Sequence, residues 1–262
     1  MNHLTKLKGL CLKTLLPMYK TANAGHIAAS LSCLDILIYL FSVKMTKDDM
    51  FILSKGHAAV ALYTVLAKSG RIPEEMLDTF YKDGTSLAAH PPCNGLIKDI
   101  PFGTGSLGHG LSLATGLTFA QKYTAKQCKI YCVLSDGDCN EGSTWEAALF
   151  AAQHKLQNLT VIVDYNKLQG FGYSQEIINL ESLAEKFKSF GFETVFAENG
   201  NDFNSLHTAF EQLSLTTSGQ PKCIVARTTK GAGISFMENK LEWHYLPMTD
   251  KEYQQALAEI HA

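Results

Sequence analysis

Two polar side chains follow two apolar segments that have the pattern of strands, and their spacing suggests a cation site. The segment Lys129–Ser135 runs into Asp136–Asp138, and Leu159–Tyr165 runs into Asn166, thirty positions after Asp136. Because neighbouring parallel strands end at one edge of a sheet, we expect both side chains to lie together there. Carboxylate and amide oxygens suit Mg²⁺, with phosphate and water completing the shell. The same residue types favour ordinary strand-to-helix turns, so spacing alone leaves both interpretations open.

A glycine-rich turn offers a place for a phosphate group. Gly103–Gly108 (GTGSLG) opens a segment with a helical pattern to about Ala125, and free N–H groups at a helix start bind anions. The string also fits G-x-G-x-x-G. A dinucleotide fold needs a strand before the first glycine and an acid about 20 positions later. Pro101-Phe102 precedes the turn and Gln121–Gln127 has no acid, which favours a phosphate site without a nicotinamide ribose.

Five histidines stand in loops or at helix starts, each close to Gly or Pro: His26, His57, His90, His109 and His244. A single loop histidine is usually a surface residue, but five in similar settings indicate a shared role. No H-x-x-x-H or H-E-x-x-H spacing indicates zinc, and no G-x-S-x-G indicates a serine hydrolase. The histidines on helical patterns are interpreted as structural: His154, His207 and His261.

The elements that must position these residues alternate between strand and helix. Strands are expected at Met50–Leu53, Lys129–Ser135, Leu159–Tyr165, Phe192–Glu198 and Lys222–Thr228. Helices are expected at about 2–20, 31–42, 57–69, 73–81, 106–125, 142–153, 180–190 and 203–213. This alternation predicts parallel βαβ units with right-handed crossovers. Residues 83–105 lack an apolar period and predict a long surface loop, and no domain boundary is evident within 1–262.

Composition excludes several classes of protein. The 262 residues are 46% hydrophobic and 18% charged, with a net charge of −2, which excludes a disordered chain. No basic or acidic run indicates a nucleic-acid or membrane-surface partner. Asp35, Lys44 and Lys129 interrupt the apolar stretches short of the ~18–20 residues of a membrane span, and lysines interrupt the N-terminus where a signal peptide would be apolar. We expect a cytoplasmic protein. The seven scattered cysteines predict buried thiols.

Five motifs follow one another along the chain: Ala24–Ser32, Phe51–His57, Thr104–Gly110, Ser135–Gly142 with Val163–Leu168, and Lys230–Gly233 with Trp243–Pro247. In this order they resemble the thiamine-diphosphate-binding half of transketolase over nearly the whole chain. The resemblance implies an α/β, three-layer thiamine-diphosphate-binding fold with a mostly parallel sheet flanked by helices, forming one diphosphate-binding domain over 1–262. Ser135 occupies the position at which the family's G-D-G motif has its first glycine. His109 occupies a position at which the family commonly has glutamine.

The resemblance also implies roles for individual residues. Asp136, Asn166 and the Leu168 carbonyl would bind Mg²⁺, or Ca²⁺ or Mn²⁺. His26, His90 and His244 would line the substrate channel and shuttle protons, for which a pKa near neutrality is suitable. Glu141 would join a carboxylate network that links two cofactor sites. The cofactor contacts implied are His57, Gly105, Ser106, Leu107, Asp136, Gly137, Asp138, Asn166, Leu168 and His244.

The family's chemistry requires a second domain, which binds the aminopyrimidine ring and supplies a glutamate that protonates it. We find no counterpart in this sequence. We therefore expect the N-terminal subunit of a split transketolase, completed by a C-terminal subunit that carries the pyrimidine-binding domain, in a heterotetramer. The assembled enzyme would transfer a two-carbon ketol unit from a ketose phosphate or related anionic ketose to an aldose.

Alternative functions stay open from the sequence. They are another thiamine-diphosphate enzyme subunit, similar to deoxyxylulose-phosphate synthase or to a 2-oxoacid dehydrogenase, and a non-catalytic cofactor-binding homologue. The histidine set favours sugar chemistry. Pentose phosphates, branched-sugar phosphates and sulfosugars all remain possible substrates.

Overall fold

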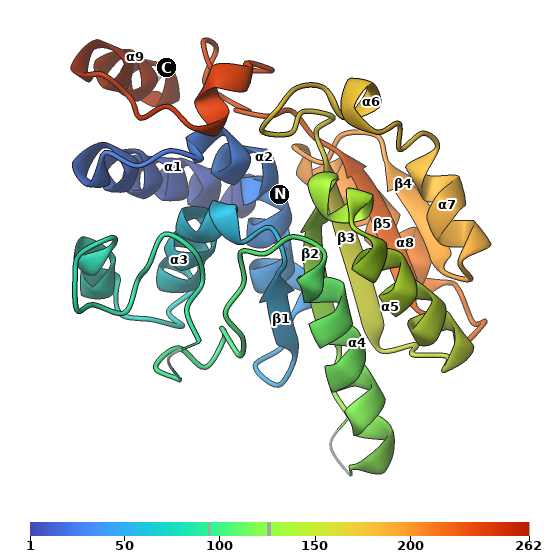
Figure 1. The fold of residues 1–262 in the computed structure, drawn as a ribbon. Coiled ribbons are helices and arrows are strands. Elements are labelled where there is room, and N and C mark those ends of the chain that lie inside the picture. Colours follow the sequence, from blue (N-terminus) through green and yellow to red (C-terminus); the bar gives the residue numbers. More distant parts are fainter. Residues whose placement is uncertain (94, 125–126, 262) are drawn as a thin grey trace.

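The computed structural model describes residues 1–93, 95–124 and 127–261, and it has a parallel five-stranded sheet at its centre (Figure 1). The strands lie in the order β1-β2-β3-β5-β4, and every pair of neighbours is parallel. Their bounds are β1 Met50–Leu53, β2 Ile130–Ser135, β3 Leu159–Tyr165, β4 Glu193–Ala197 and β5 Lys222–Arg227. The predicted strands are confirmed to within one residue at each end.

Alternate residues of the strands enter two separate apolar cores. In β2, Cys132 and Leu134 face one core, whereas Tyr131 and Val133 face the other. In a sheet that is buried on both faces, each strand is a continuous apolar segment. This is why the strands could be predicted from the sequence.

Helices cover both faces, so the predicted three-layer α/β fold is confirmed. One face carries α1 (Asn2–Ala22), α2 (Ile27–Tyr39), α3 (Ala59–Lys68), α8 (Phe203–Ser214) and α9 (Asp250–His261), which packs on α1. The other face carries α4 (His109–Ala120), α5 (Gly142–Gln153) and α7 (Leu183–Ser189), with α4 and α5 side by side in front of the sheet in Figure 1. The short helical segments are η1 (Leu40–Lys44), η2 (Gly56–Ala58), η3 (Glu74–Thr79), η4 (Gln121–Tyr123), η5 (Gly137–Asn140), α6 (Ser174–Ile177) and η6 (Leu241–His244).

Several helix boundaries differ from those predicted. α2 begins four residues early, at Ile27, because His26 adopts the left-handed conformation (φ 72°) that starts it. The expected helix at 73–81 is the 3-10 segment η3. The helix expected to end at Ala125 ends in η4 at Tyr123, and Ala125 itself lies outside the described residues. α6 was not predicted, and of α9 only His261 was placed on a helical pattern, because polar residues dominate both helices.

The expected loop at 83–105 has no helix or strand among its described residues. It is nevertheless anchored in the core, because Leu87, Ile97 and Ile100 are buried. These anchors hold the segment that precedes α4 against the rest of the protein.

One helical stretch, Ile27–Lys44, is long and apolar enough to cross a membrane by length and composition, with a mean hydropathy of 1.7. The expectation that Asp35 would cut it short was wrong, because Asp35 lies inside the helix, buried and paired with Lys8 at 2.8 Å. However, 83% of the stretch is buried in the fold, as for a central core helix.

The cysteines are thiols, and six of the seven are buried as predicted. Cys93 differs, because it lies in the loop before α4 and is exposed.

Candidate active site

A cavity of about 210 Å³ opens where the carboxyl ends of the strands meet. Residues that follow four different strands line it, together with histidines from other elements. The lining residues are His26, Ala29, Lys55, His57, His90, Gly105, Leu107, Ser135, Asp136, Gly137, Asn166, Leu168, Gln169, Gly170, Phe171, Lys230, His244 and Tyr245. This is the edge at which open parallel sheets bind ligands.

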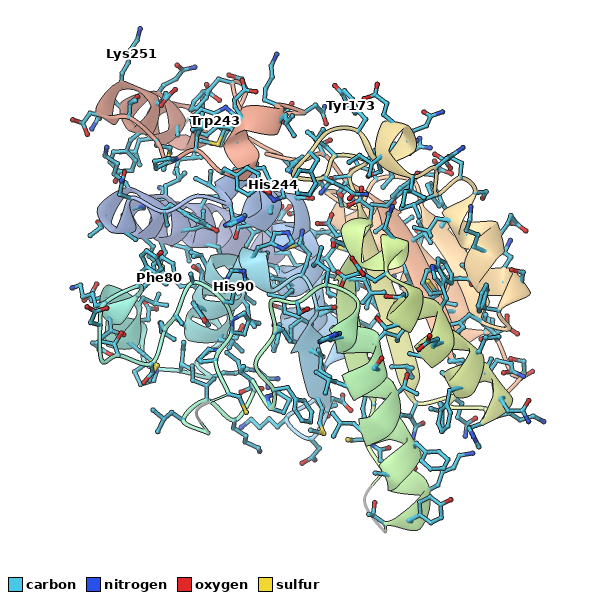
Figure 2. The ribbon with its side chains drawn as sticks, in the orientation of Figure 1. Phe80, His90, Tyr173, Trp243, His244 and Lys251 are labelled. Carbon is cyan, nitrogen blue, oxygen red and sulfur yellow. The ribbon has the colours of Figure 1, made fainter. Side chains whose placement is uncertain are left out.

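Four of the five loop histidines converge on this cavity. The ring centroid of His26 lies 5.6 Å from that of His57, 6.1 Å from that of His90 and 5.2 Å from that of His244. The rings come from the residue before α2, from η2 and η6, and from the loop before α4, and Figure 2 labels His90 and His244. The inference that these histidines share a setting is therefore supported by their geometry.

The backbone at Gly25 and His26 is held closely against η6. The His26 N–H donates to the His244 carbonyl oxygen at 2.9 Å. A Cβ at Gly25 would lie 2.3 Å from the Tyr245 carbonyl oxygen, so only glycine fits. This contact brings two histidines, more than two hundred residues apart in sequence, to one wall of the cavity.

The expectation that the histidine pKa values lie near neutrality was wrong. Burial, with smaller contributions from His90 and Lys230, lowers the pKa of His26 to about 4. Burial, followed by Lys230, lowers the pKa of His244 to about 3, and burial also lowers the pKa of His90. These rings are therefore neutral at pH 7, and each carries one N–H donor and one acceptor nitrogen.

The Asp136 and Asn166 side chains meet at the cavity, as their spacing predicted. Asp136 is 2% exposed. It accepts hydrogen bonds from the Gly137 N–H at 3.0 Å and from the Ser174 hydroxyl at 2.5 Å. Asn166 Oδ1 accepts from the Leu168 N–H at 3.0 Å. Burial raises the pKa of Asp136, while the Ser174 hydrogen bond opposes that shift.

The Leu168 carbonyl oxygen faces a positive charge supplied by the protein. The Lys230 ammonium donates to it at 2.6 Å and to His244 Nδ1 at 2.6 Å. Burial lowers the pKa of Lys230 to about 8. Because the ammonium is a donor only, Nδ1 of the neutral His244 ring is the acceptor and Nε2 carries the proton.

A buried polar network contacts Asn166 through the Ser32 hydroxyl. The Asp164 carboxylate receives hydrogen bonds from the Lys55 ammonium and from the hydroxyls of Ser32 and Thr228. Lys55 also donates to the Ala29 carbonyl at 3.0 Å. Burial alone lowers the pKa of Lys55, but the charge of Asp164 and the other anionic groups outweighs it and raises the value to about 12. The Lys55 ammonium therefore stays charged at pH 7.

The residues present fit a hard cation with a diphosphate. One carboxylate, one amide oxygen and one carbonyl oxygen are hard ligands, and a bound phosphate would add more. In the described part of the chain, no group of three or more His, Cys, Asp or Glu could hold a metal ion by itself. A Cβ at Gly137 would lie 3.1 Å from Leu107 Cδ1 and would fill the space between them. Among the described residues, no hydrogen-bond partner is found for the N–H groups of 105–107.

Four residues singled out from the sequence do not line the cavity. Ser106 and His109 line a neighbouring groove of about 720 Å³. The Asp138 carboxylate is fully buried, and it accepts from Ser54 at 2.6 Å and from the Gly108 N–H at 2.8 Å. It also accepts hydrogen bonds from the N–H and the hydroxyl of Ser135, so it stabilises the turn that follows β2. Glu141 is exposed, just before α5.

Sequence reasoning missed the two lysines that face this site. Lys55 and Lys230 were included in motifs but were given no role. Both follow strand ends, β1 and β5, so the rule that singled out Asp136 and Asn166 could have found them. Ser32 and Asp164 carried no such signal, because both lie within otherwise apolar elements.

Residues 15–260 match the family model described as transketolase, thiamine diphosphate binding domain. Over 257 residues the chain is 37% identical to one subunit of the apulose-4-phosphate transketolase of Phocaeicola vulgatus, covering 95% of this chain and 90% of that protein. It is 38% identical to a 6-deoxy-6-sulfo-D-fructose transketolase subunit of a Clostridium species, covering 91% of this chain and 89% of that protein.

Solved structures show the same fold. A transketolase from Campylobacter jejuni superposes with a TM-score of 0.87 at 27% identity, covering all of this chain. The chain spans 43% of the length of that protein.

Proposed function

This chain belongs to the transketolase family, matching its thiamine diphosphate binding domain, and we propose that it is the cofactor-binding, N-terminal subunit of a two-subunit transketolase. The assembled enzyme would transfer a two-carbon ketol unit from an anionic ketose to an aldose acceptor. The observation that carries this proposal is the convergence of four histidines on a cavity that also holds Asp136 and Asn166.

The site residues would form two groups, one that holds the metal ion and one that holds the diphosphate of the cofactor. Asp136, Asn166 and the Leu168 carbonyl would hold Mg²⁺, or Ca²⁺ or Mn²⁺ in its place. His57, Gly137 and the N–H groups of 105–107 would hold the diphosphate. When bound, thiamine diphosphate would supply the carbanion chemistry by which the sugar C–C bond breaks and forms.

The neutral histidines would position the sugar and move its protons. His244 presents Nε2–H to the cavity, because Lys230 occupies Nδ1, and this N–H can donate to a sugar oxygen. His26 and His90, which line the same cavity, would bind hydroxyls and accept protons as the C–C bond changes. Because Lys230 contacts both His244 and the Leu168 carbonyl, it would couple this wall to the cation ligands.

A partner subunit is proposed from the names of relatives, which are called subunits of transketolases. We propose a C-terminal subunit that carries the pyrimidine-binding domain, in a heterotetramer. Glu141, exposed at the start of α5, would then be available to the network that links two sites. We further propose that residues 1–262 act as one domain and that the enzyme is cytoplasmic.

The substrate class is proposed from the same relatives. Their names specify apulose 4-phosphate and 6-deoxy-6-sulfo-D-fructose, which are sugars with an anionic group. We propose that this enzyme takes an anionic ketose of that kind, phosphorylated or sulfonated.

The test is an assay of the purified chain mixed with its candidate partner, thiamine diphosphate and Mg²⁺. Ketol transfer from a ketose phosphate to an aldose phosphate is expected. Release of CO₂ from pyruvate without ketol transfer would instead favour a 2-oxoacid enzyme. Cofactor binding without either reaction would favour a non-catalytic homologue.

A further inference from the structure

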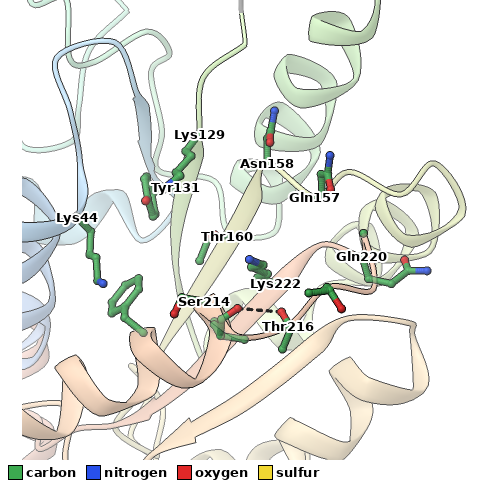
Figure 3. A pocket seen from close by; sticks show the side chains of 14 residues that line it. Lys44, Lys129, Tyr131, Gln157, Asn158, Thr160, Ser214, Thr216, Gln220 and Lys222 are labelled. Atoms are coloured by element: carbon green, nitrogen blue, oxygen red, sulfur yellow. Dashed lines mark hydrogen bonds between the residues drawn. The ribbon is translucent and has the colours of Figure 1, made fainter.

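A second cavity, of about 400 Å³, lies at the opposite end of the sheet from the candidate active site (Figure 3). The starts of β2, β3 and β5 form its floor, and the end of α8 and η1 form its walls. Strands of this length separate the two ends by about 20 Å. The cavity therefore shares no lining residue with the site described above.

The register of the sheet puts four polar side chains on one face of this floor. Tyr131 pairs with Thr160, and Thr160 pairs with Lys222. Lys129 stands two positions before Tyr131 and so points to the same face. The end of α8, with Phe210 and Leu213, covers this face.

The cavity has an excess of positive charge. Three lysines line it, and none of the residues described as lining it is acidic. Lys44 is paired with Glu211 at 2.9 Å. Lys129 and Lys222 form no ion pair within the described part of the chain.

Two carboxylates, Asp49 and Glu193, lie near these lysines, and in the described part of the chain neither forms an ion pair with them. Asp49 accepts from the backbone N–H of Lys129 at 2.8 Å, and Glu193 pairs with Lys222 across the strands. Burial, followed by the charge of Lys129, lowers the pKa of Lys222, while the charge of Glu193 opposes that shift. Two ammonium groups thus share one concave space, as in a site built for an anion.

Uncharged hydrogen-bonding groups surround the lysines. Hydroxyl and amide side chains at the rim and floor include Gln157, Asn158, Ser214 and Thr216. In Figure 3, Lys44 and Lys222 lie on the two sides of Tyr131 and Thr160. The Gln220 amide oxygen, at the rim, is buried and has no hydrogen-bond partner among the described residues. Such groups suit a polyhydroxylated molecule better than an apolar one.

We propose that this cavity is a second ligand site, which binds a phosphorylated sugar with its phosphate between Lys129 and Lys222. The sugar hydroxyls would bind the surrounding amides and hydroxyls. Since the cavity is remote from the cation ligands, its ligand would be an effector rather than the substrate in reaction. The proposal holds whether or not this chain is a transketolase subunit.

The experiment uses the ¹⁵N-labelled full chain carrying Asp136→Ala, so that cation-dependent binding at the candidate active site is removed. Glucose 6-phosphate is titrated and followed by amide chemical shifts, with glucose and inorganic phosphate as matched ligands. We expect saturable shifts at Thr160, Lys222 and Gln220 with glucose 6-phosphate, weaker shifts with phosphate and none with glucose. Equal affinities for phosphate and glucose 6-phosphate would overturn the sugar assignment.

Three variants test the lysines. Lys129→Gln with Lys222→Gln is expected to weaken binding at least tenfold, whereas Lys222→Arg keeps the charge and should keep the affinity within about threefold. Lys251→Gln, at an exposed position of α9, is the control and should change nothing. Thermal melting verifies that each variant folds. Unchanged affinity in the double variant, or shifts confined to the carboxyl edge of the sheet, would overturn the proposal.

Discussion

The Ser32 hydroxyl lies 2.9 Å from the amide nitrogen of Asn166 and accepts its hydrogen bond. The same hydroxyl donates to the Asp164 carboxylate at 2.7 Å. Because the amide nitrogen is held on this side, Asn166 Oδ1 is turned toward Leu168, whose N–H it accepts. The orientation of one proposed cation ligand is thus set by a buried serine in α2.

Replacing Ser32 with alanine should weaken cation binding. Ser32→Ala leaves the Asn166 amide unpaired and should cost about 1–3 kcal/mol of stability. Loss of a residue that orients a metal ligand typically lowers metal affinity by roughly 10–100-fold. Calorimetric titration of Mg²⁺ with thiamine diphosphate into the assembled enzyme measures the cation affinity.

Ser30→Ala is the matched control for that substitution. Ser30 is equally buried in α2, and its hydroxyl is hydrogen-bonded to the Tyr19 hydroxyl at 2.7 Å, away from Asn166. It should lose similar stability and keep its cation affinity. Equal losses of cation affinity in both variants would contradict the orienting role of Ser32.

Asp136→Ala should abolish Mg²⁺-dependent cofactor binding by the assembled enzyme, because it removes the one carboxylate among the three proposed ligands. Fluorescence or calorimetric titration of thiamine diphosphate, with and without Mg²⁺, measures the effect. Asp35→Asn, a buried carboxylate paired with Lys8, is the control and should bind the cofactor normally. Near-normal affinity in Asp136→Ala would refute its role.

His244→Ala should reduce turnover more than cofactor binding. The substitution removes the N–H directed at the cavity, while Lys230 keeps its contact with the Leu168 carbonyl. We expect kcat to fall by roughly 10²–10⁴-fold, as for a group that assists proton transfer. Cofactor affinity should change by less than about tenfold. His207→Ala is the control, because His207 lies in α8 and is hydrogen-bonded to Tyr39; this variant should retain activity. A loss explained by instability alone would count against this role.

Lys55→Met should destabilise the fold strongly. It leaves the Asp164 carboxylate buried without its counter-charge, which typically costs about 3–5 kcal/mol. Lys68→Met removes a lysine from a pair with the exposed Glu74 and should cost about 1 kcal/mol or less. Urea unfolding of both variants makes the comparison, and similar small losses would show that the buried pair is not ionised.

Acidification should destabilise the protein through its neutral histidines. The pKa of His26 is about 4 in the folded protein and about 6.5 in the unfolded chain, so the unfolded chain binds more protons between these values. The stability that depends on a neutral His26 is fully present above pH 6.5, and it is lost as the pH falls toward 4. His26→Asn, whose side chain tolerates the left-handed backbone, should lose less stability between pH 7 and pH 5. The free energy of unfolding in urea measures this loss. If it falls equally in His26→Asn and in the unsubstituted protein, the lowered pKa of His26 is contradicted.

The pair Asp136 and Asn166 could be predicted from the sequence, because strand periodicity locates where each strand ends and parallel pairing brings the ends together. The convergence of the histidines could be suspected only from their similar settings. Which of them enter the cavity depended on tertiary contacts such as that between Gly25 and Tyr245, which leave no local pattern.

Burial accounts for what could not be predicted. The histidine pKa values were misjudged because a sequence does not reveal desolvation. Lys55 and Asp164 each look unremarkable alone, and their pairing across 109 positions appears only in the folded chain. The family resemblance implied a cofactor contact for Asp138, yet its carboxylate is directed back at Ser54 and Gly108.

The most direct test of the proposed function is a titration of the candidate partner into a fixed amount of this chain, with thiamine diphosphate, Mg²⁺ and an anionic ketose donor present. Ketol transfer to an aldose is followed as the partner is added. We predict no turnover by this chain alone and activity that rises to a plateau at one partner per chain. Appreciable turnover without the partner, or none at any ratio, would contradict the proposed function.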